Sequence, residues 1–305
     1  KIMKKICLFL VFLIMITTFV WSANSTEKKV KIAYLPITHS LALLQTAKEL
    51  QEQNGVKVEL VKYGSWPELL DALNTGKVDG ASVLIELAMK SKENGAKIKA
   101  VALGHKDGNV VIVSKNINNV SDLKGKTFAI PHRQSSHHIL LQDTLKRGGL
   151  STADINLVEL PPTEMPSALA SGTIDGYSVA EPFGAISVAI GTGKVLFTSE
   201  ELWENSLCCA LVFTDEFINS NENIAKKILS DYKKAGKSLN IENAKKIAKE
   251  FFKQKDEVLD ISLQWIAYDD LEITKDTYEE LVKKVKEYKL SDNPPSYDDF
   301  VRNDL

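Results

Sequence analysis

The fold of this chain is decided by a stretch that occurs twice. Residues 72–83 read ALNTGKVDGASV and residues 168–179 read ALASGTIDGYSV, so seven of twelve positions are identical at a constant offset of 96. Each copy places a Gly-x-[Val/Ile]-Asp-Gly turn between an amphipathic segment and a short apolar run, which is typical of a helix leading into a buried strand. Because the identical residues occur in the same order at one constant offset, the two segments predict two similar α/β units.

The sequence around the two copies alternates apolar and amphipathic runs. In each unit a proline, Pro36 or Pro131, follows the first expected strand. Such alternation predicts parallel sheets with crossover helices. The expected strands are residues 30–35, 56–61, 78–83, 98–103, 127–130 and 157–160, and the expected helices are residues 41–50, 67–73, 84–90 and 139–145.

Two further apolar strands, residues 109–113 and 208–213, connect the units and predict a hinged clamshell that closes on a ligand. We expect residues 29–109 and 214–305 to form lobe 1 and residues 114–207 to form lobe 2. Amphipathic C-terminal helices are predicted to pack on lobe 1, and they cover residues 223–239, 243–252, 257–268 and 275–288.

The N-terminal end has the pattern of an export signal. Lys1, Lys4 and Lys5 precede an apolar run at residues 6–20, and small residues follow at 22–23. We therefore expect a signal peptide over residues 1–23 and a periplasmic or extracellular protein, with an uncleaved anchor as the alternative. The net charge of −2 gives no electrostatic footprint for nucleic acid.

The cysteines give no recognisable metal or disulfide pattern. Cys7 lies in the expected signal peptide, and the other two are the neighbours Cys208 and Cys209. A disulfide between neighbours is strained, and no zinc-type spacing is present. We therefore expect Cys208 and Cys209 to act as small apolar residues in a buried strand.

Polar residues gather where the first strand of the second unit ends. Residues 131–138, PHRQSSHH, contain three of the five histidines and Arg133, one of only three arginines. They lie between an expected strand and an expected helix, where the free amide groups of the first helical turn favour an anion or a polar molecule. We interpret this stretch as one side of a ligand cleft.

In doubly wound sheets the ligand lies beyond the carboxyl ends of the strands, so residues at those ends form the predicted site. Two chemistries fit the histidines: imidazoles that bond to an oxyanion or a heterocycle, and imidazoles that bind a metal. Without a His-x-x-x-His pair we predict no metal site, and we predict no cofactor. The predicted ligand-binding residues are Thr38, His39, Trp66, Ser82, His105, His132, Arg133, Ser135, His137, Ser178 and Glu181.

Three segments carry a family resemblance. They are residues 34–39 (YLPITH), 73–80 (LNTGKVDG) and 174–182 (IDGYSVAEP). Together they resemble the solute-binding proteins of nitrate, sulfonate, taurine and bicarbonate ABC transporters, a family that also includes thiamine-pyrimidine binders. The resemblance covers residues 29–305, which is everything after the expected signal peptide.

The resemblance implies an α/β periplasmic-binding-protein clamshell with two hinge strands. It implies capture of a small anion or polar organic solute, delivery to an ABC permease in the membrane, and no enzymatic activity; we expect a monomer. A histidine in the second-lobe loop of the nitrate and bicarbonate branch would correspond to His132 or His137. The alternatives are a thiamine-pyrimidine-type heterocycle binder, an enzyme on the same fold, and an exported metal binder that uses the histidines.

Overall fold

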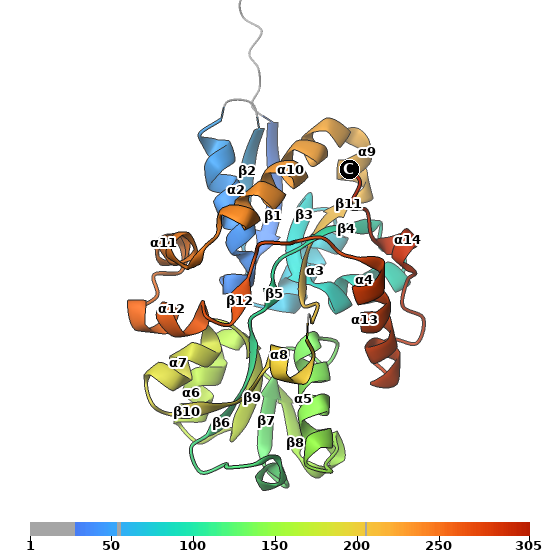
Figure 1. Cartoon of the computed structure of the whole chain (residues 1–305). Helices are drawn as coiled ribbons and strands as arrows, with labels where there is room; N and C mark the ends of the chain where they lie inside the picture. Colours follow the sequence, from blue (N-terminus) through green and yellow to red (C-terminus); the bar gives the residue numbers. More distant parts are fainter. Residues whose placement is uncertain (1–27, 54–55, 205) are drawn as a thin grey trace, which may run out of the picture.

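The computed structural model describes residues 28–53, 56–204 and 206–305 as two five-stranded sheets with helices packed around them (Figure 1). The expected signal peptide over residues 1–23 lies outside the described residues. Within the described ranges, no helix has the length and apolar character that crossing a membrane requires.

Both sheets follow one plan. Each has three parallel strands in the order second, first, third, then an antiparallel strand, then a fourth strand at the edge. The first sheet contains, in order, β2 (Val56–Lys62), β1 (Lys28–Tyr34), β3 (Gly80–Leu84), β11 (Cys209–Thr214) and β4 (Ile98–Leu103). The second contains β10 (Gly193–Thr198), β6 (Asn109–Ser114), β9 (Gly176–Ala180), β7 (Thr127–Ile130) and β8 (Asn156–Glu159).

The two antiparallel strands are the connecting strands of the sequence prediction. β6 leaves the first sheet and enters the second, and β11 returns from the second sheet to the first. Because they run against their neighbours, β6 and β11 begin at the edge where the parallel strands end. The starts of both connecting strands therefore lie between the two sheets (Figure 1).

The repeated turn has the same structural role in both sheets. The Asp79 carboxylate accepts a hydrogen bond from Lys31 N at 2.8 Å, and the Asp175 carboxylate accepts one from Thr127 N at 2.9 Å. Each aspartate thereby attaches its turn to the first strand of its own sheet. Gly76 and Gly172 open the turns at φ values of +70° and +73°, a region that favours glycine.

Helices cover both sheets, and one boundary matters for the site. The helix expected over residues 139–145 begins three residues earlier, because Ser135 caps it by accepting a hydrogen bond from His138 N.

The first sheet carries α2 (Leu41–Gln51), α3 (Trp66–Asn74) and α4 (Ile85–Glu93), and the second carries α5 (Ser136–Arg147), α6 (Met165–Ala170), α7 (Phe183–Ala189) and α8 (Ser199–Leu202).

The C-terminal helices reach further than predicted. α10 and α11 pack on α2, as expected for lobe 1, but α12 packs on α7 of the other unit. The helix expected over residues 257–268 ends at Ser262, because Ile266–Ala267 pairs as β12 with β5 (Lys106–Asp107). The C-terminal helices are α9 (Asp215–Ser220), α10 (Glu222–Ser238), α11 (Ile241–Phe252), α12 (Asp256–Ser262), α13 (Lys275–Glu287) and α14 (Tyr297–Phe300).

The second glycine of each repeat allows close packing, and we predict that Gly80→Ala and Gly176→Ala both destabilise the fold. A Cβ at Gly80 would lie 2.6 Å from the Phe213 ring, and one at Gly176 would lie 2.7 Å from the Phe128 ring. Overpacking of this kind costs about 1–3 kcal/mol. Denaturant unfolding of each variant measures the loss.

Gly64→Ala is the matched control, because the nearest atom to its added Cβ would be 4.0 Å away. We expect this variant to unfold at the wild-type denaturant midpoint. Equal midpoints for all three variants would contradict the packing role of the repeat.

Candidate functional site

Hydrogen bonds join the loops at the facing ends of the two sheets. Thr38, which follows β1, donates from its backbone N and its Oγ1 to Glu181 O at 2.9 and 3.0 Å. Glu181, which follows β9, donates from N to Gly108 O at 3.1 Å, and Tyr268 Oη donates to Thr38 O at 2.7 Å. Three loops and the segment after α12 therefore meet at one place.

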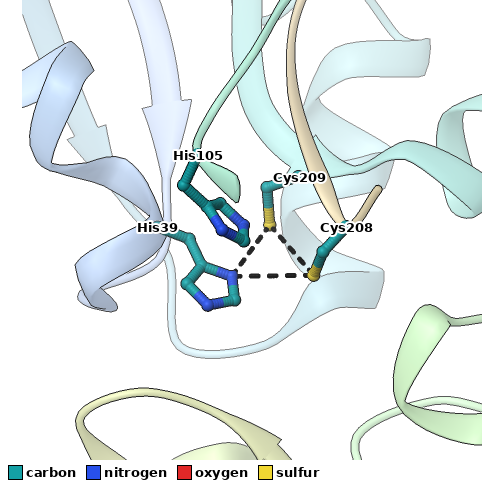
Figure 2. Close-up of side chains that lie close together, drawn as sticks. All are labelled: His39, His105, Cys208 and Cys209. Atoms are coloured by element: carbon teal, nitrogen blue, oxygen red, sulfur yellow. Dashed lines mark hydrogen bonds between the residues drawn. The ribbon is translucent and has the colours of Figure 1, made fainter. Parts of the chain in front are cut away.

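Two histidines and two cysteines converge beside this junction (Figure 2). His39 lies in the short 3-10 helix Thr38–Ser40 after β1, and His105 lies in the loop between β4 and β5. Cys208 and Cys209 lie at the start of β11, where Cys209 pairs with Leu84 at the end of β3. One nitrogen or sulfur from each of the four side chains lies within 4.8 Å of the others, and all four residues are buried.

A backbone carbonyl fixes the orientation of His39. Its Nε2 lies 2.9 Å from Gly108 O. A carbonyl oxygen only accepts hydrogen bonds, so Nε2 carries a proton, and in the tautomer with this single ring proton Nδ1 has a free lone pair. Nδ1 lies 3.6 Å from Cys208 Sγ and 3.5 Å from Cys209 Sγ, so that the lone pair faces both thiols.

His105 stacks on His39, and its polar neighbours are the Cys208 thiol and the Asp107 backbone. The ring centroids lie 3.5 Å apart with an angle of 31° between the planes. Neither ring nitrogen of His105 makes a hydrogen bond of normal geometry to the described residues. Burial, together with the neighbouring His39, lowers the pKa of His105 to about 4, so this imidazole is neutral at physiological pH.

The two thiols differ in acidity. Burial raises the pKa of the Cys208 thiol, but its contacts with Cys209, His39 and His105 outweigh burial and hold this pKa well below its ordinary value. Burial and the neighbouring Cys208 raise the pKa of Cys209. The cluster thus favours one thiolate, which is the form of cysteine that binds metals and attacks electrophiles.

A second set of polar side chains surrounds the cluster. Ile85 N donates to Cys208 O at 2.7 Å, which places the buried Glu86, in the first turn of α4, beside the cluster. His137, in the first turn of α5, is also buried, and Cys208 is among the causes that shift the pKa of both Glu86 and His137. Burial is the main cause that raises the pKa of Glu86 and lowers the pKa of His137 to about 4. Buried polar atoms without a hydrogen-bond partner among the described residues belong to Ser82, Glu86, Asn109, Ser136, His137, Ser178 and Glu181.

The structure brings part of the predicted site together. His39 and His105 are in the cluster, and His137 is in the same buried region. Ser82 and Ser178 lie in the middle of β3 and β9 rather than at the predicted strand ends, and Glu181 lies just beyond β9. All three are buried, and each has a side-chain oxygen without a partner among the described residues. The hydroxyl of Thr38 is buried but already bonds to Glu181 O.

Other predicted residues lie elsewhere or have another role. Arg133 has a side chain that is 55% exposed and pairs with Glu159 at 3.6 Å, so it does not reach the buried region. Ser135 is the N-cap of α5, and its Oγ donates to His132 O. Trp66 and His132 line a separate hollow of about 280 Å³ at the edge of the sheets.

Cys208, Cys209 and Glu86 were not predicted as site residues. The predicted burial of the two cysteines is confirmed, but their thiols face imidazoles rather than only apolar neighbours. Glu86 stands directly after the apolar run of β3, and a lone acidic residue there is the signal that could have identified it.

Comparisons with known proteins agree with this architecture. A family model described as the NMT1-like family matches residues 23–251. Among solved structures, the ligand binding component of an ABC-type import system from Staphylococcus aureus, described with zinc bound, is 43% identical to this chain. That match has a TM-score of 0.87 and covers 90% of this chain and 96% of the other.

More distant relatives are named for nitrate or nitrite and for taurine. The nitrate/nitrite binding protein NrtA of a Nostoc species is 27% identical over 66% of this chain and 51% of its own length. The taurine-binding periplasmic protein of Escherichia coli is 29% identical over 57% of this chain and 54% of its own length. The chain spans 32% to 61% of the length of the curated relatives it matches.

Glu181 provides a test of burial in this region. Its Oε2 accepts a hydrogen bond from Ala185 N at 3.1 Å, its Oε1 has no partner among the described residues, and burial raises its pKa to about 8. The folded state therefore holds this proton more tightly than the unfolded state, whose carboxyl has an ordinary pKa. Stability is lost as pH rises from the unfolded pKa of about 4.3 toward 8.

We predict that Glu181→Gln removes this loss, because glutamine has nearly the same shape and no charge. The variant should be more stable than the wild type by roughly 3 kcal/mol at pH 7, and the two should agree within about 1 kcal/mol at pH 5. Denaturant unfolding at several pH values measures the difference. A difference that does not change with pH would contradict the buried, protonated carboxyl.

Proposed function

The chain belongs to the NMT1-like family, and on that premise we propose that it is the solute-binding component of an ABC-type importer. The protein would bind a small solute between the two sheets, outside the cytoplasmic membrane, and deliver it to a membrane permease without chemical change. The described function of the Staphylococcus aureus relative, at 43% identity over nearly the whole of both chains, supports this proposal.

The observation that carries the proposal is the set of buried polar atoms that have no partner among the described residues, in β3 and β9 and in the first turns of α4 and α5. They come from both units: Ser82 and Glu86 belong to the first, and Ser136, His137 and Ser178 belong to the second. A buried polar group without a hydrogen bond costs about 1–3 kcal/mol, so native proteins rarely keep several together. A polar solute enclosed there would give these groups hydrogen-bond partners.

The side-chain charges around these unpaired polar atoms indicate which kind of solute could bind there. No lysine or arginine is among the buried side chains of the described residues, and Arg133 lies outside the region. A solute enclosed there would meet imidazoles, hydroxyls, cysteine sulfurs and carboxyl groups, and no lysine or arginine side chain. We therefore favour a small polar solute over one that needs a buried guanidinium, and the nitrate-like or sulfonate-like anion becomes the less favoured member of the class.

We predict that the solute-free protein is stabilised by one member of a panel containing nitrate, bicarbonate, taurine, alkanesulfonates and aminopyrimidines. Thermal unfolding measures the effect. A solute at about 100 times its Kd should add about 2.7 kcal/mol, because it binds only the folded state. Ser82→Ala and Ser178→Ala should each weaken binding about tenfold through loss of one hydrogen bond.

Ser171→Ala serves as the matched control, because Ser171 is exposed on the far turn of the repeat. It should bind the solute with wild-type affinity. If neither the panel nor a small-molecule extract stabilises protein that native mass spectrometry shows to be solute-free, the importer proposal fails.

A further inference from the structure

We propose that His39, His105, Cys208 and Cys209 together bind one zinc ion. The donors would be Nδ1 of His39, one ring nitrogen of His105 and the two cysteine sulfurs. Two imidazoles and two thiolates are a common tetrahedral ligand set for this ion. The proposal concerns these four donors and does not depend on which solute the protein transports.

The distances between three of the four donors fit a tetrahedral ion, and the fourth donor, a His105 nitrogen, lies within 4.8 Å of them. Zinc with Zn–S bonds of about 2.3 Å and Zn–N bonds of about 2.0–2.1 Å separates its two sulfurs by about 3.8 Å and a nitrogen from a sulfur by about 3.6 Å. In the structure, Cys208 Sγ and Cys209 Sγ lie 3.9 Å apart, and His39 Nδ1 lies 3.6 and 3.5 Å from them. These three donors therefore already occupy three corners of a suitable tetrahedron (Figure 2).

Groups around the donors orient them as outer-shell groups do in known zinc sites. A histidine that binds zinc usually donates its other ring N–H to a carbonyl or a carboxylate, and His39 Nε2 does so with Gly108 O at 2.9 Å. Asn109 Oδ1 accepts from the Cys208 thiol at 3.6 Å, and the buried Nδ2 of the same amide, which has no partner among the described residues, can donate to this sulfur once the thiol has lost its proton. Gly108 and Asn109 are consecutive, so a single segment at the start of β6 orients one donor of each type.

A hydrogen-bonded network without metal explains His105 less well. Sulfur and imidazole atoms can hold each other by thiol hydrogen bonds, and this accounts for His39 and the two cysteines. It leaves the fully buried His105 with only the Cys208 thiol and the Asp107 backbone facing its ring, and with no hydrogen bond of normal geometry to either, which is costly. Coordination through one of these nitrogens gives the ring the partner it lacks and supplies the fourth corner.

Charge also favours zinc over a monovalent ion. On binding, each thiol releases its proton to solvent and each sulfur donates an electron pair to the metal, so two thiolates cancel the two positive charges of Zn²⁺. The ring contacts and hydrogen bonds of the four donors involve no lysine or arginine within the described ranges. A buried centre with no net charge costs least in this setting, whereas a monovalent ion would leave one negative charge.

The test uses full-chain protein that carries no histidine tag and is kept reduced. We expect one zinc per chain by elemental analysis after exposure to Zn²⁺ and dialysis, with affinity measured by competition against a chromophoric chelator. Cobalt in place of zinc should give a thiolate-to-cobalt charge-transfer band and the intense visible bands of a tetrahedral ion. Cys208→Ser and His105→Gln should each weaken zinc binding by at least about 100-fold.

His138→Gln is the matched control. His138 is in the first turn of α5, but its Nδ1 bonds to Arg133 O at 2.7 Å instead of reaching the cluster. This variant should keep the wild-type zinc affinity. Because a buried cysteine or histidine variant can fail to fold, circular dichroism accompanies each titration, and zinc should slow alkylation of Cys208 and Cys209 in the unmutated protein.

Two results would overturn the proposal. One is a folded, reduced protein that binds no zinc and whose thiols react equally fast with and without it. The other is zinc binding that persists unchanged in both folded donor variants, which would mark the ion as adventitious. Neither result bears on solute capture, so the zinc site and the importer function fail separately.

Discussion

The hydrogen bond from His39 Nε2 to Gly108 O is the constraint on which the site depends. It determines which ring nitrogen carries the proton, and it thereby turns the Nδ1 lone pair toward the two thiols. The same carbonyl accepts a hydrogen bond from Glu181 N, and Glu181 O accepts from Thr38, the neighbour of His39. The donor atoms are therefore oriented by the bonds that join the two sheets.

The fold could be predicted from the sequence because it depends on a short local turn that occurs once in each unit. The turn Gly-x-[Val/Ile]-Asp-Gly uses a positive φ at its first glycine and an aspartate that bonds to the first strand, and both requirements are visible in the residue types. The reach of α12 to the second unit was not predicted, because amphipathic periodicity shows that a helix has an apolar face but not which surface covers it.

The sequence predicted only part of the site, for two physical reasons. The carboxyl ends of parallel strands predict a site at this edge, but β11 runs antiparallel. Cys208, just before β11, and Cys209, its first residue, therefore reach the same edge from the opposite direction. In residues 131–138, the start of α5 decides which histidine is buried. The cap at Ser135 places His137 inside and leaves His138 to bond with Arg133 O, a distinction that composition does not contain.

The geometry of the four donor side chains depends on how the two sheets are arranged. His39, His105 and the cysteines belong to the first sheet and its loops, whereas Gly108 and Asn109 open β6, which continues into the second sheet. A hinge motion that moved the start of β6 away would free the His39 ring to rotate and remove the Asn109 contact from Cys208. Because three separate segments supply the four donors, the cluster exists only in the folded chain, and an ion bound there would stabilise the arrangement in which both sheets hold Gly108 in place.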